Sequence, residues 1–516
     1  MTAVSSHISE SLPRTSEELD VLLLLEGTYP YVSGGVSSWV HALILGFPGL
    51  RFGGVFIGSR REDYGPMRYE LPANFVYLEE LYLFDSVSKP PIAEVRADPA
   101  TIGNVRQFHQ QFFQDWRNSS LFAAFERVID NLAPRGKLDH ATFLYSEAAW
   151  QFVKECYRAN CTDPSFVDYF WTVRTMHTPI WRLRSVIETL PHARLYHSAS
   201  TGYAGLLGAM LKLLRPRPFL LSEHGIYTKE RKIDLYQAEW IRDNRTIFER
   251  NFSEIAYFRQ LWIRFFEILG FATYQAADEI IALFEANRRR EILDGAPAER
   301  TQCIPNGIDI ARYAPLRAKR PPQPPPILCL IGRVVPIKDV KTYIRALPII
   351  LAKLPQAEAW IAGPENEDPS YAEECRALAE RLGMAERVKF LGFQKLTELL
   401  PKIGLVVLSS ISEGLPLVVL EGYAAGIPAV CTDVGSCRQL VFGLPGEDEA
   451  IGASGRIVRI ADPAGLAQAA LELLTDPAAW RAASQAAIQR VERYYDHRMM
   501  FDRYRALYQK HGLWRA

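Results

Sequence analysis

The chain has 516 residues, of which 48% are hydrophobic and 11% aromatic, so it is long enough for two or three domains with sizeable cores. Lysine and arginine together number 59, as do aspartate and glutamate, which leaves the formal net charge at zero. This balance argues against a nucleic-acid-binding protein that depends on a strongly basic field, although it leaves room for a local basic patch.

The N-terminal residues are polar and partly acidic, unlike the basic-then-apolar pattern of a secretory signal. The first apolar run, 21–25, is too short for a signal core, and no later run approaches the roughly 20 apolar residues that crossing a bilayer requires. The seven cysteines lack paired CxxC spacing, which favours reduced thiols. We therefore expect a cytoplasmic protein.

Short apolar runs that are typical of strands alternate with segments of helical length along most of the chain. In the first part these runs lie at 20–27, 51–58, 193–200, 218–225, 278–285 and 301–307, and in the second part at 327–333, 357–363, 388–393, 404–410 and 428–433. Near-continuous runs of Val, Ile and Leu between helices indicate parallel sheets covered on both faces. The predicted fold class is α/β, with one doubly wound domain in each half.

Residues 60–190 interrupt this alternation, because they are rich in aromatic residues and in helix formers. They predict a large helical insertion in the first domain, after its second strand. A further helical segment covers about 234–270, and residues 480–514 are also helical in pattern. Between the halves, the prolines of 313–326 disfavour both helix and ladder strand and predict a semi-rigid extended linker.

Two features of the first half lie just after predicted strands. Gly34 and Gly35, in EGTYPYVSGG, would let the backbone approach a phosphate beside the start of a helix, although a plain tight loop explains them equally well. His224, in SEHGIYTKER, ends another strand ahead of a basic cluster. A lone histidine is more often structural than catalytic, so neither feature is specific by itself.

Two cations follow the first strand of the second half, in LIGRVVPIKDV. Arg333 offers a rigid fork of donors and Lys338 a mobile point charge, so the pair can converge on an anion. The alternative is two solvated surface cations.

The stretch SEGLPLVVLEGYAAGIP, 412–428, carries Glu413 and Glu421 at the two ends of a mostly apolar run. Because a lone buried carboxylate is costly, each must meet either a ligand or a protein group. The stretch follows a strand, and open α/β sheets bind ligands at the carboxyl ends of their strands. Two structural glutamates that cap or bridge helices are the alternative.

Pro416 within this stretch suits the first turn of a helix. Amides that have no partner inside the helix would then lie around Leu415, Leu417 and Val418 and form a site for an anion.

Taken together, GR-x4-K followed by E-x7-E, with a Gly-Gly loop after the first strand and HG before the linker, resembles the family-4 retaining glycosyltransferases of GT-B architecture. The resemblance covers the C-terminal half closely, through IPNGID, GRVVPIKD, AGPEN, FLGFQ, SEGLPLVVLE and TDVGS, and the N-terminal half more patchily. The first loop and TDVGSCRQL are most similar to the transferases of pellicle (Pel-type) exopolysaccharide synthesis. Where the family often has DVGG, this chain has Ser436.

The resemblance implies a fold of two Rossmann-like domains that face a cleft. It places an acceptor-side domain at 1–312, the linker at 313–326 and a nucleotide-sugar-binding domain at 327–490. A C-terminal helix within 491–516 would cross back to the first domain.

The resemblance also implies roles for the catalytic residues. Arg333 and Lys338 would bind the donor diphosphate and stabilise charge on the leaving group. Glu413 would bind hydroxyls of the donor sugar, Glu421 would bind the ribose, and His224 would contact the sugar.

The rest of the donor site would be largely backbone. The amides of Gly34 and Gly35 would approach the phosphate, those near Leu415, Leu417 and Val418 would complete the anion site, and the backbone near Phe393 and Gln394 would hold the base. The family needs no metal and no cofactor beyond its nucleotide-sugar donor, which agrees with the lack of a convincing DxD motif or His/Cys cluster.

The function implied is that of a retaining, metal-independent hexosyltransferase that moves a sugar from a UDP-linked donor to a growing exopolysaccharide. Expected partners are the donor, a glycan acceptor and inner-membrane polysaccharide-synthesis proteins, which would hold the cytoplasmic protein at the membrane periphery; nucleic acid is not expected. The alternatives are a GT-B transferase of another glycan or glycolipid pathway, and a catalytically weak nucleotide-sugar-binding subunit of a polymer synthase. The aromatic insertion, which lies outside the common core, suggests acceptor binding or docking to such partners.

Overall fold

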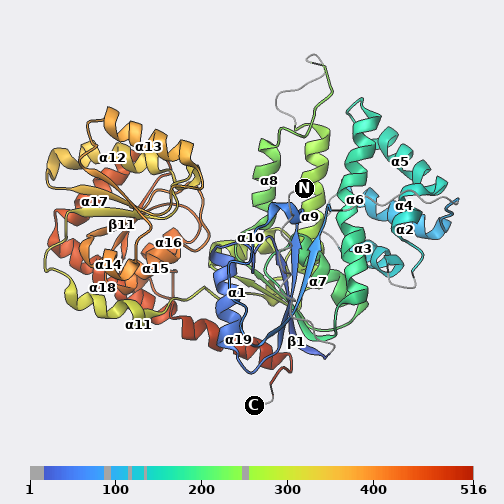
Figure 1. Ribbon diagram of the computed structural model, residues 1–516, viewed down its shortest axis with the longest axis horizontal. Coiled ribbons are helices and arrows are strands. Elements are labelled where there is room, and N and C mark those ends of the chain that lie inside the picture. The colour runs from blue at the N-terminus through green and yellow to red at the C-terminus, as the bar shows by residue number, and fades with distance from the viewer. Residues whose placement is uncertain (1–16, 86–93, 114–118, 133–135, 247–254, 515–516) are drawn as a thin grey trace, which may run out of the picture. The chain divides into compact units, whose positions relative to one another are not determined.

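The computed structural model describes residues 17–85, 94–113, 119–132, 136–246 and 255–514. The chain divides into a first unit, Met1–Ala282, Asn287–Cys303 and Leu507–Ala516, and a second unit, Leu283–Ala286 and Ile304–Ala506. Each unit is built on a parallel sheet of its own with helices against it (Figure 1), which confirms the prediction of two doubly wound α/β domains.

The first unit contains a seven-stranded sheet with the order β3-β2-β1-β4-β5-β6-β7. Its strands are β1 (Leu19–Glu26), β2 (Phe52–Gly58), β3 (Phe75–Tyr82), β4 (Ala193–Ser198), β5 (Phe219–Glu223), β6 (Glu279–Ala282) and β7 (Thr301–Cys303). All pairs are parallel, and β1 lies in register between β2 and β4, with Val21 opposite both Phe52 and Leu195. Every residue of β2 is buried, because helices cover both faces of the sheet.

Five helices alternate with these strands: α1 (Gly35–Gly46), α7 (Tyr203–Leu214), α8 (Tyr227–Gln237), α9 (Tyr257–Ala276) and α10 (Glu285–Leu293). The first nine residues of α7 are all buried, as expected of a helix that is apolar all round. Glycines let α7 approach its neighbours closely, since a Cβ on Gly208 would overlap the ring of Phe219.

The helical insertion follows β3 and comprises α2 (Pro99–Gln110), α3 (Ser119–Leu132), α4 (His140–Tyr145), α5 (Glu147–Asn160) and α6 (Phe166–Thr189). In Figure 1 these helices stand together to one side of the first sheet. The predicted start of the insertion at residue 60 is wrong, because 75–82 form an edge strand of the sheet. Acidic residues interrupt the apolar pattern of this strand, FVYLEELY, and its edge position exposes part of it.

The end of α19 (His497–Lys510) and the residues after it group with the first unit. The Tyr508 hydroxyl lies 2.9 Å from Nδ1 of the buried His197 on β4. Arg194, also on β4, donates to the carbonyl of Leu513 at 3.4 Å. Lys510 forms an ion pair with Glu279 on β6. These contacts attach the C-terminal segment to two strands of the first sheet.

The second unit contains a six-stranded parallel sheet with the order β10-β9-β8-β11-β12-β13. Its strands are β8 (Ile327–Ile331), β9 (Glu358–Ala362), β10 (Val388–Gly392), β11 (Leu405–Leu408), β12 (Ala429–Thr432) and β13 (Gly455–Val458). The helices are α11 (Ile310–Tyr313), α12 (Val340–Lys353), α13 (Pro369–Arg381), α14 (Leu396–Leu399), α15 (Leu417–Ala424), α16 (Cys437–Phe442), α17 (Pro463–Leu474), α18 (Pro477–Tyr494) and most of α19.

The linker between the halves is not extended throughout, so the prediction for 313–326 is wrong in its first part. Residues Ala314–Lys319 form a 3-10 helix directly after α11. Pro315 lies in the first turn of this helix, where a residue without an N–H loses no hydrogen bond.

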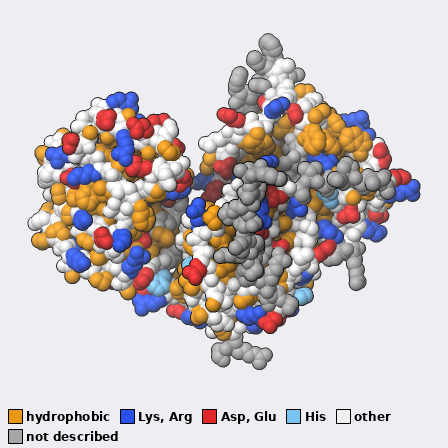
Figure 2. Space-filling view, in the orientation of Figure 1, with side chains coloured by type: hydrophobic (Ala, Val, Ile, Leu, Met, Phe, Trp, Pro, Cys, Tyr) orange, Lys and Arg blue, Asp and Glu red, His pale blue; other side chains and the backbone are white. Residues whose placement is uncertain are grey.

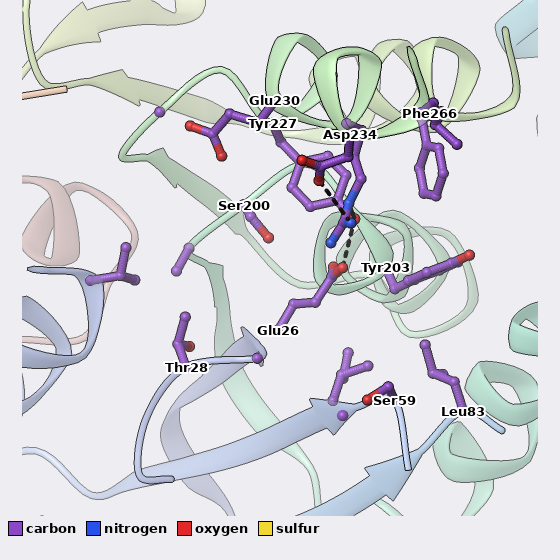
Figure 3. A pocket seen from close by; sticks show the side chains of 18 of the residues that line it. Glu26, Thr28, Ser59, Leu83, Ser200, Tyr203, Tyr227, Glu230, Asp234 and Phe266 are labelled. Carbon is purple, nitrogen blue, oxygen red and sulfur yellow. Dashed lines mark hydrogen bonds and ion pairs between the residues drawn. The ribbon is translucent and has the colours of Figure 1, made fainter. Parts of the chain in front are cut away.

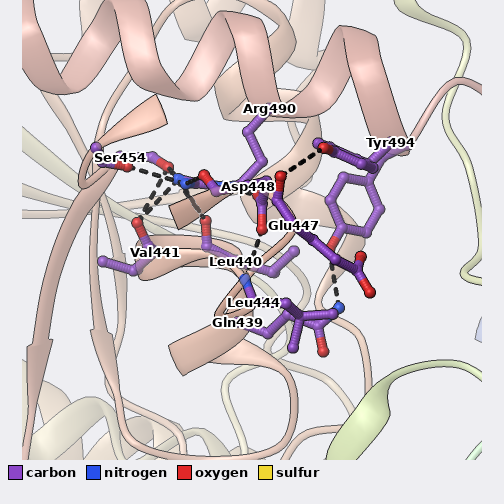
Figure 4. A network of polar contacts seen from close by, with 11 residues as sticks. Gln439, Leu440, Val441, Leu444, Glu447, Asp448, Ser454, Arg490 and Tyr494 are labelled. Atoms are coloured by element: carbon purple, nitrogen blue, oxygen red, sulfur yellow. Dashed lines mark hydrogen bonds and ion pairs between the residues drawn. The ribbon is translucent and has the colours of Figure 1, made fainter. Parts of the chain in front are cut away.

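A buried polar network ties α18 to the loop before β13 (Figure 4). The Arg490 side chain is fully buried, and its Nε donates to Asp448 at 2.6 Å. Its other nitrogens donate to the carbonyls of Val441 at 2.9 Å and Gly452 at 2.9 Å. The buried charge is thus paired and its donors are used, which is the condition under which such a group is tolerated.

The face drawn in Figure 2 has blue and red side chains interspersed over both units, in line with the balanced charge of the chain. Within the described ranges, none of the helices combines the length and the apolar character needed to span a bilayer.

Candidate active site

In the second unit, the order of the strands reverses between β8 and β11, where ligands bind in open α/β sheets. The loops that leave these two strands carry the predicted residues, and they are hydrogen-bonded to each other. The amide of Ile411 donates to the carbonyl of Ile337 at 2.8 Å, and the Ser409 hydroxyl donates to the carbonyl of Lys338 at 2.9 Å. The sheet topology therefore brings together two motifs that lie far apart in the sequence.

Glu413 meets a protein cation in this structure. The Lys338 ammonium donates to its Oε1 at 2.5 Å, and the Ser410 hydroxyl donates to the same oxygen at 2.5 Å. Both members of the pair are mostly buried, with side chains 20% and 13% exposed. Asp339 follows the lysine in the left-handed region, with φ 42°, and its side chain caps α12. The lysine is thereby fixed at a strained turn, a feature that is common at functional sites.

Arg333 does not converge with Lys338 on one point in this structure, since it forms an ion pair with Glu367 instead. Both side chains of that pair are about half exposed, so the contact contributes little stability and is readily exchanged.

Glu421 lies on α15 and accepts a hydrogen bond from the Tyr313 hydroxyl at 2.8 Å. Burial raises the pKa of Glu421, and the hydrogen bond from Tyr313 acts in the opposite direction. Glu413 and Glu421 thus both have partners within the protein, and their contacts to a ligand stay predictions.

The TDVGS turn packs directly on the Glu413 loop. Gly435 has φ 53°, and a Cβ there would lie 2.3 Å from the carbonyl oxygen of Glu413. The next residue, Ser436, donates both its amide and its hydroxyl to the carbonyl of Gly414, at 3.0 Å each. Ser436, which stands where the resembling family often has a second glycine, therefore holds the loop of the predicted site in place.

The predicted base and anion contacts lie on the same unit. Phe393 is 83% exposed and follows β10 directly, and Gln394 bonds to the local carbonyl of Leu391 at 2.6 Å. Leu415, Leu417 and Val418 are half-buried at the start of α15, whose N-cap is Pro416. The start of α15 therefore lies directly after the Glu413 loop.

In the first unit, Gly34 is the N-cap of α1 and Gly35 its first residue. A Cβ on either glycine would meet nothing within 4 Å, so the space beside this helix start is open in the first unit. His224 is partly buried and packs against Trp39, with ring centroids 4.5 Å apart. Burial lowers the pKa of His224 to about 3, so the imidazole is neutral near pH 7.

The first unit also contains a cavity of about 660 Å³ at the carboxyl ends of its strands (Figure 3). Glu26, the last residue of β1, accepts hydrogen bonds from the Tyr227 hydroxyl at 2.6 Å and the Ala204 amide at 3.2 Å. Arg231 donates to the same Tyr227 oxygen at 3.1 Å, and its guanidinium lies 5.1 Å from the centre of the Tyr227 ring.

Further carboxylates and aromatic rings complete this cavity. Burial raises the pKa of Glu230, and Asp234 lies 3.3 Å from Arg231. Trp262 and the 64% exposed Trp240 meet edge to face, with ring centroids 5.7 Å apart. Acceptor oxygens beside flat apolar rings suit a ligand that is rich in hydroxyl groups.

Of the residues that line this cavity, the sequence indicated His224 and, in the basic cluster that follows it, Arg231. Glu26 could have been found, because a carboxylate that ends a buried strand at the carboxyl edge of a sheet is a recognisable signal. The role of Tyr227 was not visible, since it depends on how α8 packs.

Within the parts of the chain that the structure describes, no three His, Cys, Asp or Glu side chains are grouped so as to hold a metal ion. Metal independence stays a prediction.

Two family models match the chain. The model described as "Domain of unknown function (DUF3492)" matches residues 19–299, and the model described as "Glycosyl transferases group 1" matches residues 325–476.

Curated proteins match over parts of their length. A D-inositol 3-phosphate glycosyltransferase of Nocardia farcinica is 29% identical over 213 residues, which are 39% of this chain and 46% of that protein. A glycogen synthase of Mycobacterium tuberculosis is 34% identical over 194 residues, which are 37% of this chain and 44% of that protein. The chain thus spans about half the length of the curated relatives it matches.

Solved structures match over nearly all of the chain. HepE of Anabaena, in complex with UDP and glucose, superposes with a TM-score of 0.53 and 16% identity, covering 96% of this chain and 100% of that one. Sucrose-phosphate synthase of Thermosynechococcus elongatus superposes with a TM-score of 0.57 and 16% identity, covering 95% of this chain and 98% of that one. At this identity the likeness shows the fold, which is GT-B.

Proposed function

Since the chain belongs to the family described as "Domain of unknown function (DUF3492)", and its second unit matches the group 1 glycosyl transferases, we propose that it transfers a sugar from a nucleotide-sugar donor to a glycan acceptor. The observation that supports this most is that the loops after β8 and β11 are hydrogen-bonded to each other where the strand order reverses. This contact places Lys338 beside Glu413.

The second unit supplies the chemistry that such a donor needs. Breaking the bond between sugar and diphosphate leaves negative charge on the phosphate, and a fixed cation and helix amides lower that barrier by preorganised electrostatics. The donor diphosphate would compete with Glu413 for the Lys338 ammonium. Glu413, once released from the lysine, would then bind a hydroxyl of the sugar.

We further propose a UDP-linked donor, retention of the anomeric configuration without a metal, and an exopolysaccharide of the Pel type as the product. Support comes from the GR-x4-K and E-x7-E motifs and from the likeness of TDVGSCRQL to the Pel-type transferases. A transferase of another glycan pathway would share the donor half and differ in the acceptor. Arg333, Gly34, Gly35 and His224 keep their predicted donor contacts in this proposal.

A Lys338→Ala variant tests the proposal. The control is Lys341→Ala, which removes a neighbouring lysine that is paired with Glu374. Calorimetry should show that UDP binds wild type more tightly than GDP or ADP. Lys338→Ala should lose about 2.7–4 kcal/mol of transition-state stabilisation in a UDP-sugar turnover assay, while Lys341→Ala keeps full turnover. Normal turnover by a folded Lys338→Ala protein would show that the site is misassigned.

A further inference from the structure

A second cavity, of about 430 Å³, lies in the first unit beside the helical insertion. Its lining differs in charge from that of the cavity in Figure 3, which has the carboxylates of Glu26, Glu223, Glu230 and Asp234 against one arginine. As far as the structure describes the chain, the lining of the second cavity includes no carboxylate. It has three arginines, one histidine and two tryptophans: Arg60, Arg174, Arg182, His140, Trp171 and Trp181.

Most of this lining comes from one face of α6. Trp171, Arg174, Thr178, Arg182 and Ser185 follow one another at intervals of three or four residues, so they form a single stripe along the helix. Cationic, hydroxyl and aromatic groups therefore alternate along the same wall of the cavity.

The charge of Arg174 is met by neutral groups. It donates to the Tyr145 hydroxyl at 3.1 Å, and its guanidinium lies 5.7 Å from the centre of the Trp171 ring. Among the residues that the structure describes, no carboxylate forms an ion pair with it. Arg60, from the loop after β2, lies 3.5 Å from Glu62, but both side chains are mostly exposed and such a contact is weak.

His140 lies beside two of these arginines. Burial lowers the pKa of His140, and Arg174 and then Arg182 act in the same direction. The adjacent Asp139 opposes them, but its carboxylate is engaged as the N-cap of α4, where it accepts from the Thr142 amide at 2.7 Å.

These two cavities lie next to each other, because Phe84 and Thr175 line both. A ligand that enters the carboxylate-lined cavity with its hydroxyl-bearing end would reach the arginine-lined cavity with its next part. We propose, on the basis of the proposed function, that the arginine-lined cavity binds an anionic group, a phosphate or a carboxylate, which the saccharide acceptor carries beyond the sugar that is extended.

Arginine forks match the oxygens of phosphate and carboxylate in geometry, and hydrogen bonds between charged groups are the strong ones. Trp171 and Trp181 supply flat apolar faces beside these forks. The insertion would thus select acceptors by charge, while the first cavity binds the hydroxyl groups of the sugar.

The test uses the full chain and three ligands of similar size: glucose 1-phosphate, glucuronic acid and methyl glucoside. Binding is measured by calorimetry or ligand-observed NMR for wild type, Arg174→Gln and Arg60→Gln. The control is Arg106→Gln, which removes an arginine of the insertion that is paired with Glu155 at 2.7 Å and does not line the cavity. UDP binding is measured in parallel for every variant.

We expect at least one of the two anionic sugars to bind wild type at least tenfold more tightly than methyl glucoside. Arg174→Gln and Arg60→Gln should each reduce this preference, by about tenfold for Arg174→Gln, and Arg106→Gln should leave it intact. Preference for glucose 1-phosphate assigns a phosphate, and preference for glucuronic acid a carboxylate.

Equal binding of charged and neutral sugars to wild type, or an undiminished preference in both cavity variants, would overturn the inference. If Arg174→Gln does not fold, Arg60→Gln decides, since Arg60 lies on an exposed loop. Failure of UDP to bind would count against the proposed function and would leave the comparison of the three sugars readable on its own.

Discussion

Glu291, on α10, is a buried carboxyl whose replacement should stabilise the protein. Its side chain is fully buried, and neither oxygen has a hydrogen-bond partner among the residues that the structure describes. Burial, and then the neighbouring Glu223, raise the pKa of Glu291 from 4.5 to about 10. The folded protein therefore keeps a proton here that the unfolded chain releases.

The magnitude follows from proton linkage. Between pH 4.5 and 10 the folded state holds one proton more at Glu291 than the unfolded state, so this residue lowers the free energy of unfolding as the pH rises. Each pH unit above 4.5 lowers the free energy of unfolding by about 1.4 kcal/mol. The loss is about 2 kcal/mol at pH 6 and about 5 kcal/mol at pH 8. Glu291→Gln has the shape of the protonated acid and no such dependence.

Urea titrations followed by tryptophan fluorescence, at several pH values, measure the difference between wild type and Glu291→Gln. The gain should grow by about 3 kcal/mol from pH 6 to pH 8. Any cost of burying the amide is the same at every pH, so the slope is the decisive quantity. An equal difference at both pH values would refute the view that Glu291 is a neutral buried acid.

Glu223 provides the contrast, because it is equally buried but accepts three hydrogen bonds. Its donors are the Thr201 hydroxyl at 2.9 Å, the Tyr274 hydroxyl at 2.5 Å and the Tyr227 amide at 3.0 Å. Glu223→Leu would leave the Tyr227 amide without its acceptor and should destabilise the first unit by about 1–3 kcal/mol.

Three further predictions concern the second unit. Glu413→Gln should lower kcat more than it raises KM. Glu421→Gln should mainly raise the KM for the donor, because ribose binding is shared by ground and transition states. Steady-state kinetics that show the same effect in both variants would contradict this. Arg490→Leu leaves Asp448 without its buried partner and should lower the unfolding free energy by about 3–5 kcal/mol, measured by urea titration; an unchanged midpoint would count against it. Gly435→Ala should destabilise the fold more than Gly446→Ala, since both glycines have positive φ but only the first Cβ would overlap backbone; equal losses in a thermal melt would show that the overlap relaxes.

The sheets were predictable wherever a strand is a continuous apolar run, as β1 and β11 are. The edge strand β3 was not, because Glu79 and Glu80 interrupt the apolar run of its sequence, FVYLEELY. The linker was misread because proline was taken to exclude any helix, although Pro315 lies in a first turn where it is tolerated.

The donor half of the site was predictable as a set of motifs at strand ends, but not as a set of contacts. Lys338 and Glu413 pair because β8 lies next to β11 in the sheet, and strand order is not written in any local pattern. The arginine-lined cavity was invisible for a similar reason. Arg60 comes from the end of β2 and Arg174 from α6, more than a hundred residues later.

The C-terminal segment that completes the first unit has a consequence for synthesis on the ribosome. Strand β4 needs Tyr508 beside His197, yet Tyr508 is translated about 200 residues after the last strand of its sheet. At about 5–20 residues per second, the nascent first unit waits about 10–40 s without the Tyr508 side chain beside His197 on its central strand. Chaperones that bind apolar nascent chains should therefore remain on this protein until its final helix emerges. A circular permutant that begins at residue 304, in which this helix is made before the strands of the first sheet, should release them earlier.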